Sequence, residues 1–361
     1  MRLRRWGGAR LAPVGALVGI GLAALALSGC SKEEPTANKP DASVSGQPSA
    51  GKDNATQPTA TGKKKIVFIF KIGGISYSEA CKRGAEQAAG DPALNVDVDY
   101  QASVEGTAEK QVDLINNAIV EHADAIVISP VDAQAVVPAL DKATEQGIKV
   151  FTWDADSPNS KRLYYFAAVD DVGIGDDIAK ALVKDIGSGK VLLFSGQSTA
   201  ENLNLHLKGI QEGLKQPGIS VVDQVYYNDD DNTKATSMAM QALQAHPDVK
   251  GIACTNSVSP KAAAEALRKQ HLVGKVKVWG LGLPSENKAY LKDSSISGLY
   301  LWDPQKLTYD TAVLVKGVLD GKNPTDGMEI GSDGKLSVKD KIVTLPLRLE
   351  ITKNNVDQLN F

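Results

Sequence analysis

Short apolar runs rich in β-branched residues recur along this chain, each followed by a polar or glycine-rich segment and then by a stretch with helical spacing. We predict ten strands at these runs: 66–70, 96–100, 125–129, 149–153, 164–169, 191–195, 220–227, 251–255, 276–280 and 297–301. Continuous apolar runs that alternate with helices indicate parallel sheets covered by helices on both faces. Ten strands exceed what one compact doubly wound sheet usually carries, so we predict two α/β lobes with parallel sheets.

The predicted lobes are discontinuous in sequence. We expect residues 63–169 and 304–341 to form the N-terminal lobe, and residues 170–303 and 342–361 to form the C-terminal lobe. The chain would cross between the lobes near residues 170, 303 and 346. Two similar lobes joined by several crossovers make a hinge.

The first thirty residues carry the pattern of a secretion signal. Four arginines precede an apolar stretch, residues 11–27, that is too short and too soon interrupted for a membrane-spanning helix. The sequence "LSGC" at 27–30 resembles a bacterial lipobox, which implies lipidation at Cys30 and a membrane anchor; a plain signal with an incidental cysteine is the alternative. Residues 31–62 are poor in apolar side chains and predict a disordered tether.

Charge and cysteine content exclude further classes. The formal net charge of −3 includes the four signal arginines, so the mature chain is more acidic and offers nothing that attracts nucleic acid. Apart from Cys30, the cysteines are Cys81 and Cys254, which fall in different predicted lobes. We therefore expect two buried free thiols and no disulfide.

Polar and aromatic residues follow many of the predicted strands. Ligands of open parallel sheets bind beyond the carboxyl ends of the strands, so these residues are the candidate ligand-binding set. The set is Lys71, Tyr77, Asp154, Asp156, Glu201, Asn202, Thr255, Asn256, Ser257 and Trp302. Ionised aspartates accept hydroxyl hydrogens, Lys71 offsets their charge, and Tyr77 and Trp302 suit the C–H faces of a sugar ring. This combination predicts a cleft for a small sugar or polyol.

No constellation for catalysis or metal binding is visible. The four histidines, His122, His206, His246 and His271, have neither metal-ligand spacing nor a position after a strand, so we expect helix or surface residues. The run "NDDDN" at 228–232 lacks the glycine and distal glutamate of an EF-hand, and we expect a solvated turn with a helix cap at Asn232 or Thr233. We expect no catalytic residue, metal or cofactor.

One enzyme alternative rests on "VFTWDADS" at 150–157. A hydrophobic strand that ends in Asp-x-Asp resembles the nucleophile motif of haloacid-dehalogenase phosphatases, with Asp154 as the nucleophile and Asp156 as acid and base. That family places the motif at its first strand, and no lysine and acidic metal loop follow here in order. A surface phosphatase is therefore a weaker hypothesis than a binding protein.

Several segments together resemble the type I periplasmic binding proteins that serve as sugar receptors. They include the lipobox, "KIVFIFKIGG" (65–74), "TWDAD" (152–156), "GLYLWDPQKL" (298–307) and "LPLRLEITKNNVDQLNF" (345–361). The likeness is greatest to the autoinducer-2 and rhamnose-binding branch. It implies two lobes with a three-crossover hinge, a monomeric lipoprotein at the periplasm or cell surface, and an ABC transporter permease as partner.

The resemblance carries over to individual residues only in part. The autoinducer-2 receptors use a lysine after the first strand and the first aspartate of "TWDSD", which Lys71 and Asp154 match. Where they have Asp-Gln, this chain has Glu201 and Asn202; where they have Pro-Asp-Ala, it has residues 255–257. We therefore expect a pentose, deoxyhexose or related polyol in preference to autoinducer-2. An autoinducer-2 receptor and a sugar sensor for a signalling kinase are the alternatives.

Overall fold

The computed structural model describes residues 62–331 and 334–361. The predicted signal, Cys30 and all but the last residue of the predicted tether lie outside this range. Within the described range, none of the helices combines the length and apolar character needed to cross a bilayer.

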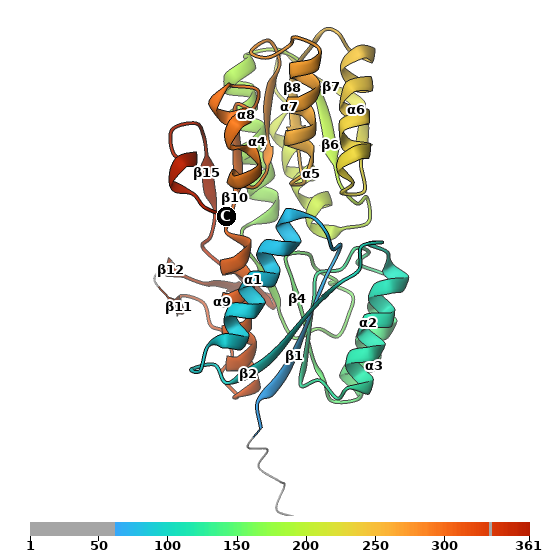
Figure 1. Ribbon diagram of the computed structural model, residues 1–361, viewed down its shortest axis with the longest axis vertical. Helices are drawn as coiled ribbons and strands as arrows, with labels where there is room; N and C mark the ends of the chain where they lie inside the picture. The colour runs from blue at the N-terminus through green and yellow to red at the C-terminus, as the bar shows by residue number, and fades with distance from the viewer. Residues whose placement is uncertain (1–61, 332–333) are drawn as a thin grey trace, which may run out of the picture. The chain divides into compact units, whose positions relative to one another are not determined.

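Seven strands form the first sheet, in the spatial order β13, β14, β5, β4, β3, β1, β2. Figure 1 labels β1, β2 and β4 of this sheet. Their bounds are β1 Lys64–Phe70, β2 Val96–Ala102, β3 Ala125–Ile128, β4 Lys149–Trp153, β5 Tyr165–Ala167, β13 Ser337–Lys339 and β14 Ile342–Thr344. The strands from β14 to β2 are parallel, and β13 runs antiparallel to β14 at the edge.

Helices cover both faces of the first sheet because both faces are apolar. Along β1, Val67 and Ile69 join the apolar cluster of α2 (Ala108–Val120) and α3 (Val137–Glu145). The alternate residues Ile66, Phe68 and Phe70 point to the other face, where α1 (Ser76–Gly90) packs against α9 (Pro304–Leu319). Period-2 alternation with apolar residues at every position is what a strand buried on both faces requires.

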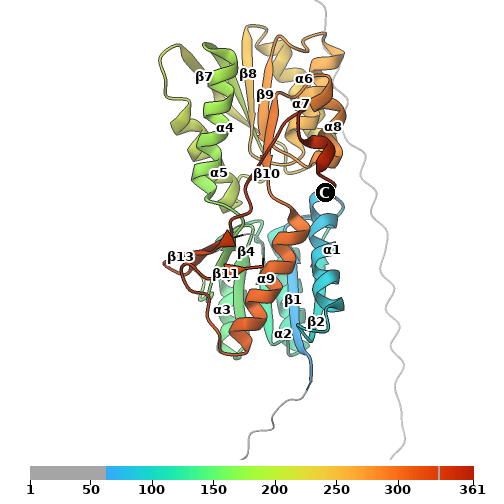
Figure 2. The same cartoon turned by 90° about the vertical axis from the view of Figure 1, so that its left-hand side faces the viewer.

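The second sheet has six strands in the order β15, β10, β9, β8, β6, β7. Its strands are β6 Gly189–Ser195, β7 Ile219–Tyr227, β8 Val249–Cys254, β9 Lys277–Leu281, β10 Gly298–Leu301 and β15 Leu349–Ile351, the last antiparallel to β10. Figure 2 shows α4 (Asp171–Ile186) and α5 (Glu201–Gly213) on one face. The other face carries α6 (Asn232–Ala245), α7 (Ser259–Lys269) and α8 (Pro284–Lys292). A two-stranded sheet of β11 (Glu329–Ile330) and β12 (Gly334–Lys335) and a 3-10 turn, η1 (Val356–Gln358), complete the described elements.

The chain passes between the two sheets three times, after β5, after β10 and after β14. Each of the ten predicted strands corresponds to one of β1–β10, and the predicted α/β class is confirmed. The sheets are mixed at their edges, where β13 and β15 run antiparallel to their neighbours. Cys81 and Cys254 are buried free thiols, as expected.

The strand pairing corrects one expected boundary. We placed residues 342–361 with the second sheet, but β14 pairs in parallel with β5 and extends the first sheet. The three residues of β14 are too few to show a sheet preference in the sequence. We propose that each sheet with its helices is one lobe, with the last crossing after Thr344.

Candidate functional site

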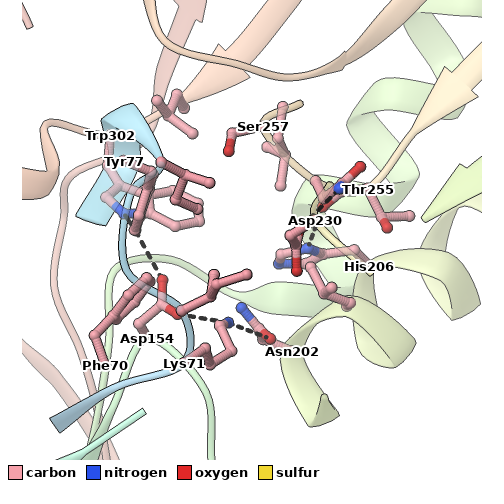
Figure 3. A pocket seen from close by; sticks show the side chains of 16 residues that line it. Phe70, Lys71, Tyr77, Asp154, Asn202, His206, Asp230, Thr255, Ser257 and Trp302 are labelled. Atoms are coloured by element: carbon pink, nitrogen blue, oxygen red, sulfur yellow. Dashed lines mark hydrogen bonds and ion pairs between the residues drawn. The ribbon is translucent and has the colours of Figure 1, made fainter. Parts of the chain in front are cut away.

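A cavity of about 50 Å³ lies at the carboxyl ends of strands from both sheets (Figure 3). It is lined by Phe70, Lys71, Ile72, Ile75, Tyr77, Asp154, Asn202, Leu203, His206, Asp230, Thr255, Asn256, Ser257, Leu281, Leu301 and Trp302. Eight of the ten predicted site residues are in this lining. The volume holds a few water molecules. A ligand of monosaccharide size therefore requires the lining to move apart.

A buried ion pair joins the ends of β1 and β4. Lys71, directly after β1, donates from Nζ to Asp154 Oδ2 at 2.8 Å. Ser129 donates to the same oxygen at 2.9 Å, and Tyr77 donates to Oδ1 at 2.7 Å. Asp154 thus has three donors for about four acceptor positions. The lysine charge and these bonds make the buried carboxylate tolerable.

Tyr77 connects this ion pair to Trp302. The Trp302 indole donates from Nε1 to the Tyr77 hydroxyl at 2.7 Å, and the two rings stand nearly perpendicular, with centroids 6.4 Å apart. Burial and the neighbouring Asp154 carboxylate raise the pKa of Tyr77 well above its usual value. Tyr77 therefore stays protonated and keeps donating to Asp154.

Residues after β6 and β8 form the opposite wall. Asn202, on α5, accepts from Lys71 Nζ at 3.2 Å through Oδ1. The Thr255 hydroxyl bonds to Ser195 at 2.7 Å. Asn256 donates both amide hydrogens to neighbouring side chains. Ser257 lines the cavity beside them.

Asp156 is absent from this lining, contrary to our expectation. Its carboxylate accepts from Arg162 Nε at 2.5 Å and Nη2 at 2.6 Å, and also from the Thr152 hydroxyl and the Ser157 amide. The two aspartates of "DAD" separate because Asp154 has a left-handed φ of 59° and Ala155 bridges back to Trp153. Asp156 is therefore occupied by its own neighbours.

Glu201 is also outside the cavity. It is the first residue of α5 and lines a separate hollow together with Asp156 and Asp171. Partial burial and these two carboxylates raise the pKa of Glu201. Successive helix residues point about 100° apart, so Asn202 faces the cavity and Glu201 faces away.

Two polar residues of the lining, Asp230 and His206, were not in the predicted set. Asp230 lies in the run that we expected to be a solvated turn, but it is only 6% exposed. The cap of α6 is Asp231, which accepts from the Lys234 amide at 2.6 Å. Asp230 lies three residues beyond the end of β7. The position beyond the carboxyl end of a strand, which identified the other site residues, therefore describes Asp230 as well.

His206 was expected as a helix or surface residue. It lies on α5, as expected, but it is fully buried and lines the cavity. Its Nε2 lies 2.9 Å from Asp171 Oδ1, and its Nδ1 lies 3.3 Å from the Thr255 carbonyl oxygen. Its position four residues after Asn202, on the same helix face, is the sequence signal that could have identified it.

Residues 66–323 match the family model described as "Periplasmic binding protein domain". The chain belongs to this family. The match spans strands of both sheets and the nine α-helices described above, and it ends before β11. Membership of a family of binding proteins agrees with the expectation that the chain is not an enzyme, and the occupied Asp156 carboxylate gives the phosphatase hypothesis no free acid.

Individual relatives show the same likeness. The ribose import binding protein RbsB of Bacillus subtilis is 25% identical over 306 residues, which cover 82% of this chain and 91% of that protein. An ABC transporter solute-binding protein from Clostridium phytofermentas with bound L-rhamnose has 26% identity and a TM-score of 0.76, covering 82% of this chain and 98% of that one.

LsrB from Clostridium saccharobutylicum, in complex with AI-2, has 25% identity and a TM-score of 0.75, covering 82% of this chain and all of that one. These comparisons confirm the predicted type I periplasmic binding protein fold and the resemblance to the rhamnose and autoinducer-2 receptors.

Proposed function

We propose that this protein captures a small sugar or polyol outside the cytoplasm and delivers it to an ABC importer. The observation that carries the proposal is the cavity at the strand ends of both sheets, where a buried lysine–carboxylate pair adjoins two aromatic rings. Charged side chains form strong hydrogen bonds with hydroxyl groups, and aromatic rings cover apolar C–H faces. Relatives named for ribose import or solved with L-rhamnose support this ligand class.

The proposed ligand is a pentose, a deoxyhexose or a related polyol. Besides its polar groups, the cavity has an aliphatic wall that includes Ile72, Ile75, Leu281 and Leu301. Such a wall suits a ligand with an apolar edge. The side chains at 202 and 255–257 differ from those of the autoinducer-2 receptors, which favours a sugar over autoinducer-2.

Capture works by hinge closure between the two lobes. Lys71 follows β1 of the first sheet and donates to Asn202 on α5, a helix that covers the second sheet, so this hydrogen bond joins the two proposed lobes. Opening the hinge separates the two side chains and admits the ligand. Closing it surrounds the ligand with donors and acceptors from both walls, and the permease recognises the closed form.

The proposed membrane anchor and location rest on the sequence alone. Lipidation at Cys30 would anchor the protein to a membrane, and the following segment would tether a monomeric binding domain at the periplasm or cell surface. A sugar sensor for a signalling kinase would have the same cavity and a different partner.

Titration calorimetry tests the ligand class directly. The purified protein would be titrated with L-rhamnose, D-ribose, D-arabinose, D-xylose and autoinducer-2. We expect saturable one-site binding of at least one sugar and weaker or no binding of autoinducer-2. Binding of autoinducer-2 alone contradicts the preference for a sugar, and no heat from any compound contradicts the proposed function.

A further inference from the structure

Three carboxylates in and beside the cavity differ in how many donors they already receive. Asp156 accepts from four donor groups and Asp154 from three. Asp230 accepts one side-chain bond, from Asn256 Nδ2 to Oδ1 at 2.7 Å. Among residues 62–331 and 334–361, none donates to Asp230 Oδ2. A carboxylate has about four acceptor positions, so Asp230 keeps most of its capacity unused.

A ring of buried polar side chains fixes Asp230 in place. The Asp230 amide donates to Asn228 Oδ1 at 3.0 Å, and Asn256 donates to the same oxygen at 2.9 Å. Ser259 donates to Asn256 Oδ1 and accepts from Asn228 Nδ2. The amide hydrogens of Asn256 are thus both in use, and the role of Asn256 is to hold the carboxylate.

The backbone around Asp230 is strained in a way that fits a functional site. Asp229 and Asp230 have left-handed φ angles of 54° and 58°. A Cβ on Gly196 would lie 2.4 Å from Asp230 Oδ1, so any larger residue at 196 would displace the carboxylate. Left-handed positions persist where the surrounding structure enforces them, often at ligand sites.

Asp230 is buried without a contacting cation. Its side chain is more than nine-tenths buried, and within the described chain it takes part in no ion pair. Lys71 acts on it only from a distance and is committed to Asp154 and Asn202. A buried carboxylate without a cation or a full set of donors is costly. A ligand that brings donors would remove this cost.

We propose that Asp230 is a specificity-determining residue of the cavity, the carboxylate that accepts hydroxyl hydrogens from a neutral sugar or polyol. In Figure 3 it lies across the cavity from Tyr77 and Trp302, so the ligand would lie between the carboxylate and the rings. Asp154, already occupied, orients Lys71 and Tyr77. An ammonium ligand fits less well, because Lys71 lines the same cavity and would repel it. This inference rests on the proposed function and names the group that selects the ligand.

Asp230→Asn tests the inference, with Asp229→Asn as its matched control. Asparagine keeps the shape and tolerates the left-handed φ, but the bond from Asn256 holds its oxygen, so its NH₂ replaces the acceptor that faces the cavity. Asp229 has the same left-handed backbone, is exposed, and does not line the cavity. The probe is whichever of L-rhamnose, D-ribose, D-arabinose and D-xylose binds the unaltered protein most tightly.

We expect Asp230→Asn to weaken binding of that sugar roughly 10- to 100-fold, the range for losing a charged hydrogen bond, and Asp229→Asn to leave it within about twofold. Equal affinity for both variants and the unaltered protein overturns the inference. So does an amino sugar that binds more tightly than its neutral counterpart and depends on Asp230. Failure of the proposed function is distinguishable, because the unaltered protein would then bind no sugar.

A second readout requires no ligand. If Asp230 serves the ligand, the unliganded Asp230→Asn protein should unfold at a higher temperature than the unaltered protein, because a buried charge has been removed. If Asp230 serves only to hold the loop, the same variant should unfold at a lower temperature. That second result overturns the inference.

Discussion

The hydroxyl of Tyr77 donates a 2.7 Å hydrogen bond to Asp154, a residue 77 positions later in the chain. The same hydroxyl accepts from Trp302 Nε1, so one oxygen connects α1 to the segments that follow β4 and β10. Tyr77→Phe would leave the indole hydrogen without an acceptor and Asp154 without one donor. We expect sugar affinity to fall roughly tenfold and the free energy of unfolding to fall by about 1–3 kcal/mol.

The control for Tyr77→Phe is Tyr309→Phe. Tyr309 donates to Asp91 at 2.6 Å, which is also a tyrosine–aspartate bond, but it does not line the cavity. Calorimetry of both variants measures the loss of sugar affinity, and thermal denaturation measures the loss of stability. Equal losses of sugar affinity in the Tyr77→Phe and Tyr309→Phe variants would show that the Tyr77–Asp154 hydrogen bond does not contribute specifically to binding.

Asp154→Asn should weaken sugar binding while the fold is retained. The substitution removes the charge that holds Lys71 at 2.8 Å, so the ammonium is no longer fixed toward the ligand. We expect roughly a 10- to 100-fold loss of affinity, measured by calorimetry on protein whose circular dichroism is unchanged. Unchanged binding would refute the role of the Lys71–Asp154 pair.

Asp156→Asn should do the reverse, losing stability and sparing affinity. Arg162 would keep its buried charge without a full partner, and breaking a buried ion pair in this way costs about 3–5 kcal/mol. Glu145→Gln is the matched control, because the exposed Lys161–Glu145 pair should contribute at most about 1 kcal/mol. Denaturant titration gives both values. If Asp156→Asn abolishes sugar binding in protein that is still folded, Asp156 belongs to the site after all.

The stability of Asp230→Asn should depend on pH with a defined sign. Burial raises the pKa of Asp230 above its usual value, with Asp154 and Asp229 adding to the rise and Lys71 and the Asn256 hydrogen bond opposing it. The ionised form is therefore disfavoured in the folded protein. This cost is full at pH values above the folded pKa, and it is lost as the pH falls from the folded pKa to the lower pKa of the unfolded chain. The variant should gain roughly 1–3 kcal/mol at neutral pH.

That gain should shrink as the pH is lowered from the folded pKa of Asp230 toward its ordinary, unfolded pKa. Thermal denaturation of the unaltered protein and the variant across an acidic pH series measures it. Asp229→Asn removes only the smallest of the contributions that raise the pKa of Asp230, so this exposed variant should show a much weaker trend. A gain that is independent of pH would show that the carboxyl charge is not its source.

The sequence predicted the fold well because the strand signal is strong where both faces of a strand are buried. Ile66–Phe70 in β1 and Ala125–Ile128 in β3 are apolar at every position, and each is followed by a clear helical pattern. The short strand β14 gave no such signal. Its three residues lie near an edge of the first sheet, where pairing with β5 and not composition decides the sheet to which they belong.

The site was predicted from one rule, that ligands of parallel sheets bind beyond the carboxyl ends of the strands. Lys71 and Asp154 lie directly after β1 and β4, and the rule found them. The prediction that Asp156 lines the cavity was wrong, because the left-handed backbone at Asp154 turns the chain and Asp156 pairs with Arg162. The spacing of the two aspartates does not reveal this turn. Asp230 was missed because its acidic neighbours suggest an exposed turn, whereas its hydrogen bonds with Asn228 and Asn256 hold it in a buried position.

Native mass spectrometry of the freshly purified protein tests the central claim most directly, since the cavity should hold one neutral sugar or polyol with Asp230 as its hydroxyl acceptor. We predict a co-purified adduct with the mass of one pentose, deoxyhexose or related polyol, retained in Asp229→Asn and depleted in Asp230→Asn. An adduct with the mass of autoinducer-2, or a sugar adduct retained equally in both variants, would contradict the account.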